Sequence, residues 1–166
     1  MESFLMFLAT SLVLRITTPK FKRYLLANGC SVLLVSGNRT LHFKHTRDGE
    51  RVYFYDHAVA GVTYGLIMVH MKELYTLHQA ENILVQYINR MRRPLRIAYN
   101  VAMQIEKKKG VITICDYWQD EAGHDWKIKG YTNGKTIAVL YVKNIGESPV
   151  NEHDGFINGF RFPNFS

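Results

Sequence analysis

Cysteine is scarce in this chain, and the motifs that mark several common enzyme classes are absent. Only Cys30 and Cys115 occur among 166 residues, too few for a disulfide scaffold, and they do not form a CxxC pair. The sequence contains no glycine-rich phosphate loop, no dinucleotide-binding fingerprint and no HxxxH or HExxH motif. These absences exclude the best-marked forms of redox, nucleotide and zinc chemistry. Each cysteine lies beside strand-like residues, so we expect buried free thiols, with a single disulfide as the alternative in an oxidising compartment.

The chain also lacks an apolar run long enough to cross a bilayer, which needs about 20 residues. Residues 4–14 have the length of a signal-peptide core, but Glu2 stands where a signal carries positive charge, and no clear small-x-small site precedes Arg15. We expect residues 1–20 to be a first strand or helix of the fold, or a vestigial or truncated signal. The expected location is cytoplasmic, or periplasmic or secreted if this run is part of a signal. No integral membrane span is predicted.

Composition favours one folded domain over residues 1–166. Hydrophobic residues make up 47% of the chain and charged residues 21%, which is typical of a globular rather than a disordered protein. The 10 tyrosines and 9 phenylalanines favour strands. Lysine and arginine number 21 against 14 acidic residues, a net charge of +7. Such a charge attracts nucleic acid, anionic membrane or an acidic protein, but it also serves solubility alone.

A capped amphipathic helix is predicted over residues 76–93. Thr76 and Gln79 have the spacing of a capping box, in which each side chain accepts a hydrogen bond from the other residue's backbone N–H. Apolar residues then recur at helical spacing and form one stripe: Leu77, Ala80, Ile83, Leu84, Tyr87, Ile88 and Met91. Pro94 ends the helix, because it cannot donate a hydrogen bond and it disfavours helical geometry in the residue before it.

Strands are predicted on both sides of this helix. Apolar runs and alternation mark residues 30–36, 40–46, 51–55, 62–71, 95–106, 111–118, 126–131 and 136–143. Asp48-Gly49 predicts a two-residue hairpin turn, and Asn133-Gly134 predicts a second tight hairpin because both positions accept positive φ. In the 95–106 strand, Tyr99 and Ile105 are expected on the same face.

These elements define the fold class. Residues 136–143 are apolar on both faces, which is typical of a central strand. A short C-terminal helix is predicted at residues 151–158, anchored by Phe156, Ile157, Phe160 and Phe162. The sequence therefore predicts an α+β fold, in which an antiparallel sheet of two β-meanders carries one long amphipathic helix and one short terminal helix.

The second half of the chain follows the element order of a known superfamily. After the helix come a strand pair, the segment GYTNGK at residues 130–135, an apolar strand at 137–142 and the ending FINGFRF at 156–162. In this respect residues 50–163 resemble the PsbP-like superfamily, which includes bacterial DcrB-type proteins and type VI secretion adaptor chaperones. Gly159 stands where serine is commoner in that ending. Most members are non-enzymatic binding or assembly proteins, so the resemblance implies a binding role and assigns no site residue.

Basic residues form the candidate partner-binding site. Four arginines lie at the predicted helix end and the start of the next strand: Arg90, Arg92, Arg93 and Arg96. Three lysines lie at the far turn of that strand: Lys107, Lys108 and Lys109. About 12 residues of strand would separate the groups by about 40 Å, so we expect two patches. The alternative is helix-dipole compensation and a solvated turn. Binding of nucleic acid would need aromatic residues on the same face, for which Tyr53, Tyr55, Trp118 and Trp126 are the candidates.

The histidines and Cys115 give weaker indications of chemistry. His42 and His45 lie three apart on a predicted strand and so face opposite sides. His57, His124 and His153 each neighbour an aspartate in turn-like sequence, which seldom forms a metal site. Cys115 could act as a nucleophile with a distant histidine, but no nucleophile-elbow motif surrounds it. We expect no metal and no cofactor.

The expected function is that of a non-catalytic protein-binding module: an adaptor, a chaperone or a toxin-neutralising immunity-type protein. Its partner would be another protein with an acidic surface, bound through the basic residues. One alternative is a nucleic-acid-binding protein that uses the same basic patches. Another is a small hydrolase with a Cys/His site at Cys115.

Overall fold

The computed structural model describes residues 19–26, 28–37, 41–147 and 150–164. The sequence expectation for residues 1–20 falls almost wholly outside these ranges. The strands are β1 (Phe21–Leu25), β2 (Ser31–Val35), β3 (His42–His45), β4 (Arg51–Val59), β5 (Val62–His70), β6 (Ile97–Asn100), β7 (Gln104–Lys108), β8 (Val111–Asp120), β9 (Asp125–Thr132) and β10 (Thr136–Lys143). The helices are α2 (Leu77–Arg92), the 3-10 turn η1 (Ile145–Glu147) and α3 (Val150–Ile157).

One large antiparallel sheet organises the described chain. Its eight strands run in the order β3-β4-β5-β10-β9-β8-β6, and β7 pairs with β8 beside β6. The strand β10 lies between β5 and β9, so the expectation of a central strand is confirmed. The hairpin β1–β2 forms a separate two-stranded sheet. The strand β1 was not anticipated from sequence.

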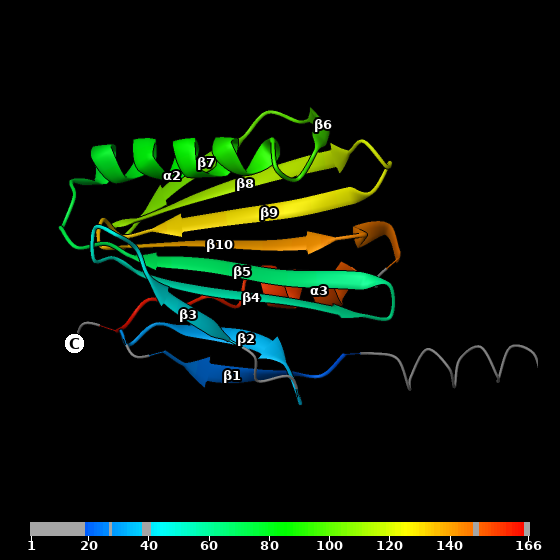
Figure 1. Ribbon diagram of the computed structural model, residues 1–166, viewed down its shortest axis with the longest axis horizontal. Helices are drawn as coiled ribbons and strands as arrows, with labels where there is room; N and C mark the ends of the chain where they lie inside the picture. Colours follow the sequence, from blue (N-terminus) through cyan, green and yellow to red (C-terminus); the bar gives the residue numbers. More distant parts are fainter. Residues whose placement is uncertain (1–18, 27, 38–40, 148–149, 165–166) are drawn as a thin grey trace, which may run out of the picture.

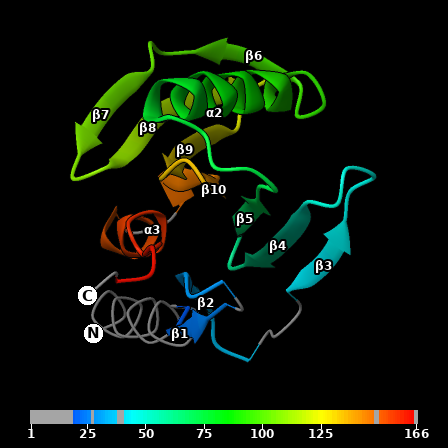
Figure 2. The ribbon, with the colours of Figure 1, turned by 90° about the vertical axis from the view of Figure 1, so that its left-hand side faces the viewer.

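Other elements pack on both faces of the sheet, as Figures 1 and 2 show. The helix α2 covers one face above β8 and β9, and its stripe meets a core that includes Leu84, Ile88 and Ile128. On the other face, α3 and the β1–β2 hairpin enclose a second core that includes Tyr64 and Phe156. Each inward face of the sheet thus has its own apolar layer, and the predicted α+β class is confirmed.

The long helix begins and packs as its sequence predicts. The Thr76 side chain accepts from the backbone of Gln79, and the reciprocal hydrogen bond of the capping box is also present. Ala80, Leu84 and Ile88 are buried. A Cβ at Gly130 would lie 2.8 Å from Cδ1 of Ile88, so the glycine permits the close approach of α2 to β9.

The two glycine hairpins have longer turns than the sequence predicts. Between β3 and β4, the Thr46 N–H donates to the Glu50 carbonyl over 2.9 Å, which leaves three residues in the loop with Gly49 at φ 83°. The predicted two-residue turn is therefore wrong, and the loop is a three-residue hairpin with glycine in the left-handed position. In the second hairpin Gly134 takes positive φ, whereas the Asn133 side chain accepts from the backbone of Lys135 and Thr136.

The predicted strand at residues 95–106 is divided into β6 and β7, which is the main correction to the sequence interpretation. Asn100 pairs with Trp118, and Gln104 pairs with Cys115, so three residues on one strand span only two on the other. This extra residue reverses the side-chain alternation. Tyr99 shares a face with Gln119, away from α2, whereas Ile105 shares the α2 face with Ile114. The expectation of a common face for Tyr99 and Ile105 is wrong.

The short terminal elements agree with prediction. Helix α3 matches the predicted 151–158 helix within one residue. Phe156 and Ile157 are fully buried, Phe160 is buried and Phe162 packs against the same core. Among the residues that the structure describes, no helix has the length and hydrophobicity that a membrane crossing requires, in agreement with the sequence.

Candidate functional site

The end of α2 presents three of the four predicted arginines to solvent. Arg90 and Arg93 are exposed in and just after the last turn of the helix. Arg96 is exposed and takes positive φ (53°) in the turn that leads into β6. No carboxylate in the described ranges forms an ion pair with any of the three. Their charges are therefore available to a partner.

Arg92 has a different environment, because its charge is paired within the fold. Its Nη2 lies 2.8 Å from Oδ2 of Asp116, whose side chain is fully buried. The guanidinium also lies 5.7 Å from the ring centroid of Trp118, within the range of a cation–π contact. Arg92 thus forms an internal ion pair that joins α2 to β8, and its role in partner binding stays a prediction.

The three predicted lysines are divided between the two faces of the sheet. Lys107 pairs in register with Ile112 on the α2 face and forms an ion pair with Glu81 of the helix. Lys108 points to the opposite face, and Lys109 lies in the β7–β8 turn at φ 49°. Lys107 therefore serves the contact between helix and sheet, while Lys108 and Lys109 remain exposed.

Lys108 and Lys109 line a cavity that was not expected from the sequence. The cavity lies on the face of the sheet away from α2, which we call the open face. Its volume is about 260 Å³, and its lining also includes Lys129, Thr113 and Glu106. The Nζ of Lys129 donates to Oδ1 of Asn158 over 2.6 Å, which holds this ammonium beside α3. We call this set of five residues the lysine cavity. It brings together three cations and one hydroxyl with a single carboxylate, an arrangement that suits an anion.

Exposed aromatic side chains lie on the same face of the sheet as the lysine cavity. Tyr99 is 64% exposed and Tyr117 is 41% exposed, and both belong to the side that faces away from α2. The Nζ of Lys127 lies 5.6 Å from the Tyr117 ring centroid and 2.5 Å from Oδ1 of Asp154. Tyr99 was missed from sequence because the extra residue between β6 and β7 determines its orientation.

The aromatic residues proposed from sequence occupy other positions. Trp118 and Trp126 are buried under α2, and Tyr55 is buried in the opposite core. Tyr53 is half-buried and lies against the ring of Phe43 on β3. None of the four lies beside the lysine cavity, because each belongs to one of the two apolar layers or to the distant β3–β4 hairpin.

A polar cluster around Asp120 closes the β8–β9 turn near Arg96. One oxygen of the buried Asp120 carboxylate accepts from the backbone of Ala122 and His124, and the other accepts from Nε1 of Trp126 at 3.1 Å. Burial alone would raise the pKa of this carboxyl, but the hydrogen bonds and the nearby His124 hold it well below its usual range. These residues also line a cavity of about 350 Å³. Both carboxylate oxygens of Asp120 already accept hydrogen bonds, so the cluster stabilises the β8–β9 turn.

The strands on either side of Cys115, β7 and β9, contain no histidine. Both cysteines are free, Cys30 buried and Cys115 half-buried. Cys115 lies between Gln104 of β7 and Lys129 of β9 in the sheet register. A hydrolase site there would need a histidine from elsewhere in the chain.

The histidines remain dispersed in the structure. His42 stacks on Phe54 at 5.0 Å, and His45 meets the edge of Phe43 at 4.8 Å. Within the described ranges, no group of three or more histidine, cysteine or acidic residues could hold a metal ion.

The fold and these surfaces define an α+β protein with a divided basic surface. A comparison with protein-family models finds no matching family, and a comparison with curated proteins finds no match. The resemblance of residues 50–163 to the PsbP-like superfamily stays a prediction.

Proposed function

We propose that this chain is a non-catalytic protein-binding module, of the adaptor, chaperone or immunity-protein kind, that binds an acidic partner at the lysine cavity. The observation that carries the proposal is the convergence of Lys108, Lys109 and Lys129 on one cavity of the open sheet face. A concave surface with three cations gives an acidic side chain more than one contact at once. The resemblance to a superfamily of binding proteins supports the same role.

The three lysines of the cavity, Lys108, Lys109 and Lys129, have no ion-pair partner within the described chain. Glu106 is the one acidic residue of the lining. Because charged groups at a binding surface chiefly set the association rate and the choice of partner, an acidic surface would be attracted and a basic one repelled.

The test compares two double charge reversals of equal size. Lys108→Glu with Lys109→Glu alters the lysine cavity, and Arg90→Glu with Arg93→Glu alters the end of α2. Each variant and the unaltered protein is used as bait after nuclease treatment, and captured proteins are quantified by mass spectrometry. We expect one stoichiometric protein that the lysine variant loses and the arginine variant keeps.

The reverse pattern would move the site to the end of α2. Retention of the partner by both variants would remove the basic surface from the proposal. Circular dichroism of each variant establishes that a lost interaction does not come from unfolding.

Nucleic acid is the second candidate, because exposed aromatic residues lie on the same sheet face as the lysines. Tyr99 and Tyr117 could stack on bases while Lys108 and Lys129 contact phosphates. The test is fluorescence anisotropy with a labelled single-stranded dT12 oligonucleotide at several salt concentrations. Binding would weaken steeply with salt, and Tyr117→Ala would reduce affinity by at least about five-fold. A flat salt response excludes this candidate.

A further inference from the structure

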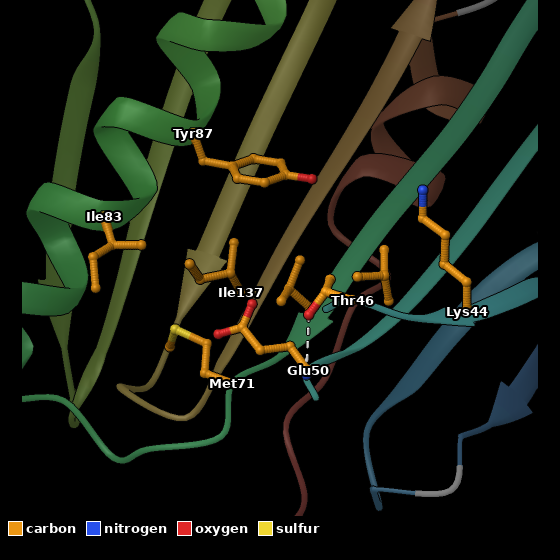
Figure 3. A pocket seen from close by; sticks show the side chains of 9 residues that line it. Lys44, Thr46, Glu50, Met71, Ile83, Tyr87 and Ile137 are labelled. Carbon is orange, nitrogen blue, oxygen red and sulfur yellow. Dashed lines mark hydrogen bonds between the residues drawn. The ribbon is translucent and has the colours of Figure 1, made fainter. Parts of the chain in front are cut away.

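A third cavity lies between α2 and the β3–β4 hairpin, on the opposite face of the sheet from the lysine cavity. Its volume is about 290 Å³, near the lower end of about 300–1,000 Å³ for small-molecule sites. Apolar side chains from four different segments form most of its walls: Val52, Val69, Met71, Ile83 and Ile137. The helix lies over β8 and β9, and the cavity lies beside it, over β4, β5 and β10 (Figure 3).

Two polar groups converge on this apolar cavity. Figure 3 shows the carboxylate of Glu50 turned inward from the β3–β4 loop toward Met71 and Ile137, and the ring of Tyr87 extending from α2 across the cavity. The loop holds Glu50 in place, because its backbone N–H donates to Oγ1 of Thr46 over 3.1 Å. Burial and then the Glu50 charge raise the pKa of Tyr87, so its hydroxyl stays protonated at neutral pH.

Glu50 is half-buried, and its carboxylate lacks a cationic partner within the described part of the chain. Lys44 also lines the cavity, but its Nζ lies 5.7 Å from the ring centroid of Phe54 and points away from Glu50 (Figure 3). A carboxylate that loses part of its hydration beside apolar walls is stabilised by a cation that replaces the lost water. The cavity therefore has an uncompensated negative group and an apolar interior.

We infer that this cavity binds a small organic ammonium compound with an apolar body. The ammonium would pair with the Glu50 carboxylate and donate to the Tyr87 hydroxyl, while the apolar body would lie against Val69, Ile83 and Ile137. An aromatic or short branched body fits the volume, whereas an extended lipid chain exceeds it. A ligand with a carboxylate would place its charge against Glu50, which argues against a fatty acid.

The experiment uses three ligands of nearly equal size that differ in charge: 2-phenylethylammonium chloride, 2-phenylethanol and sodium 3-phenylpropionate. Each is titrated into the ¹⁵N-labelled full chain, and affinity is taken from amide shifts and calorimetry. We expect the ammonium compound to bind most tightly, with shifts at Val69, Met71 and Ile83. Glu50→Gln should weaken its binding about ten-fold, as the loss of a charge-assisted hydrogen bond predicts, and leave 2-phenylethanol unchanged.

Two further variants separate charge from position. Glu73→Gln removes the same charge from an exposed residue outside the cavity and should change nothing. Ile83→Phe fills the cavity from α2 and should weaken the ammonium compound and 2-phenylethanol alike. Three results would each overturn the inference: no binding of the ammonium compound at millimolar concentration, equal binding of 3-phenylpropionate, or an unchanged affinity in Glu50→Gln.

Discussion

Arg92 and Asp116 form an ion pair that joins the last turn of α2 to β8. The Nη2 of Arg92 lies 2.8 Å from Oδ2 of Asp116, and the side chain of Asp116 is fully buried while that of Arg92 is 26% exposed. The same carboxylate oxygen accepts from Nε1 of Trp118 at 2.7 Å, and the other accepts from the backbone of Tyr117 at 3.0 Å. Among the described residues, Arg92 is the only cation paired with this buried carboxylate.

Replacing Arg92 should destabilise the protein far more than replacing either neighbouring arginine. Arg92→Met leaves the Asp116 carboxylate buried without its cation and should lower the free energy of unfolding by about 3 kcal/mol. Arg90→Met is the matched control and should change it by less than about 0.5 kcal/mol, because Arg90 is exposed. Urea unfolding at pH 7 measures both.

A double variant shows whether the buried charge is the cause. Adding Asp116→Asn to Arg92→Met should recover part of the loss, because no unpaired charge is then buried. If the double variant is as unstable as the sum of the two single variants, Arg92 acts through packing on Trp118.

Gly65 should tolerate no side chain, because the ring of Tyr141 lies directly over it. A Cβ at Gly65 would fall 1.9 Å from Cζ of Tyr141. The Tyr141 hydroxyl donates to Oδ2 of Asp56 over 2.5 Å, which fixes the ring in that position. Gly65→Ala should therefore cost about 2 kcal/mol of unfolding free energy by overpacking.

The control for this contact is a glycine with open space around it. Gly155 lies in α3, and an added Cβ there would have no atom of a neighbouring element within 4 Å, so Gly155→Ala should be neutral or stabilising. In a Tyr141→Ala background, Gly65→Ala should lose most of its cost. An unchanged cost there would place the strain in the backbone instead of in the ring contact.

Local sequence signals predicted the elements whose cause is local. The capping box of Thr76 and Gln79 and the apolar stripe through Leu84 and Ile88 determine α2 without reference to the rest of the chain. The close approach of the Tyr141 ring to Gly65, by contrast, depends on the pairing of β5 with β10. The antiparallel sheet followed from the short connections between apolar runs.

The candidate site could be predicted only in part, because it depends on pairings between distant segments. One extra residue between Asn100 and Gln104 turns Tyr99 to the open face, and nothing in the alternating sequence shows where that residue falls. The assignment of Arg92 to Asp116 and of Lys107 to Glu81 likewise depends on how α2 lies on β7 and β8. Neighbouring basic residues in sequence therefore have different roles in the fold.

The two free cysteines should differ in reactivity. Cys30 is 1% exposed, and burial raises its pKa to about 11. At pH 8 its thiolate fraction would be about one in a thousand. In the native protein a disulfide-exchange reagent such as DTNB should react with the half-buried Cys115 first and with Cys30 only after unfolding. Cys115→Ser should remove the fast reaction. If Cys30→Ser removed the fast reaction instead, this assignment would be contradicted.

Asp120 should make the stability of the protein depend on pH in the acid range. Hydrogen bonds from His124 and Trp126 outweigh burial and hold its pKa below the value of about 3.9 in an unfolded chain. A carboxyl whose pKa is depressed on folding stabilises the native state above the unfolded pKa. That stabilisation is lost as the pH falls below about 4 toward the native pKa, because the unfolded chain then binds the proton first.

The variant Asp120→Asn tests this dependence against Asp48→Asn, an exposed turn residue. At pH 7 Asp120→Asn should lower the free energy of unfolding by about 2 kcal/mol, because charged hydrogen bonds are replaced by weaker ones. The difference from the unaltered protein should hold constant from pH 7 to pH 5 and shrink below about pH 4, whereas Asp48→Asn should change little throughout. Urea unfolding across this pH series provides the measurement. A difference that stays constant down to pH 2.5 would contradict this explanation. It would mean that Asp120 stabilises the turn through its geometry and not through the charge of its carboxylate.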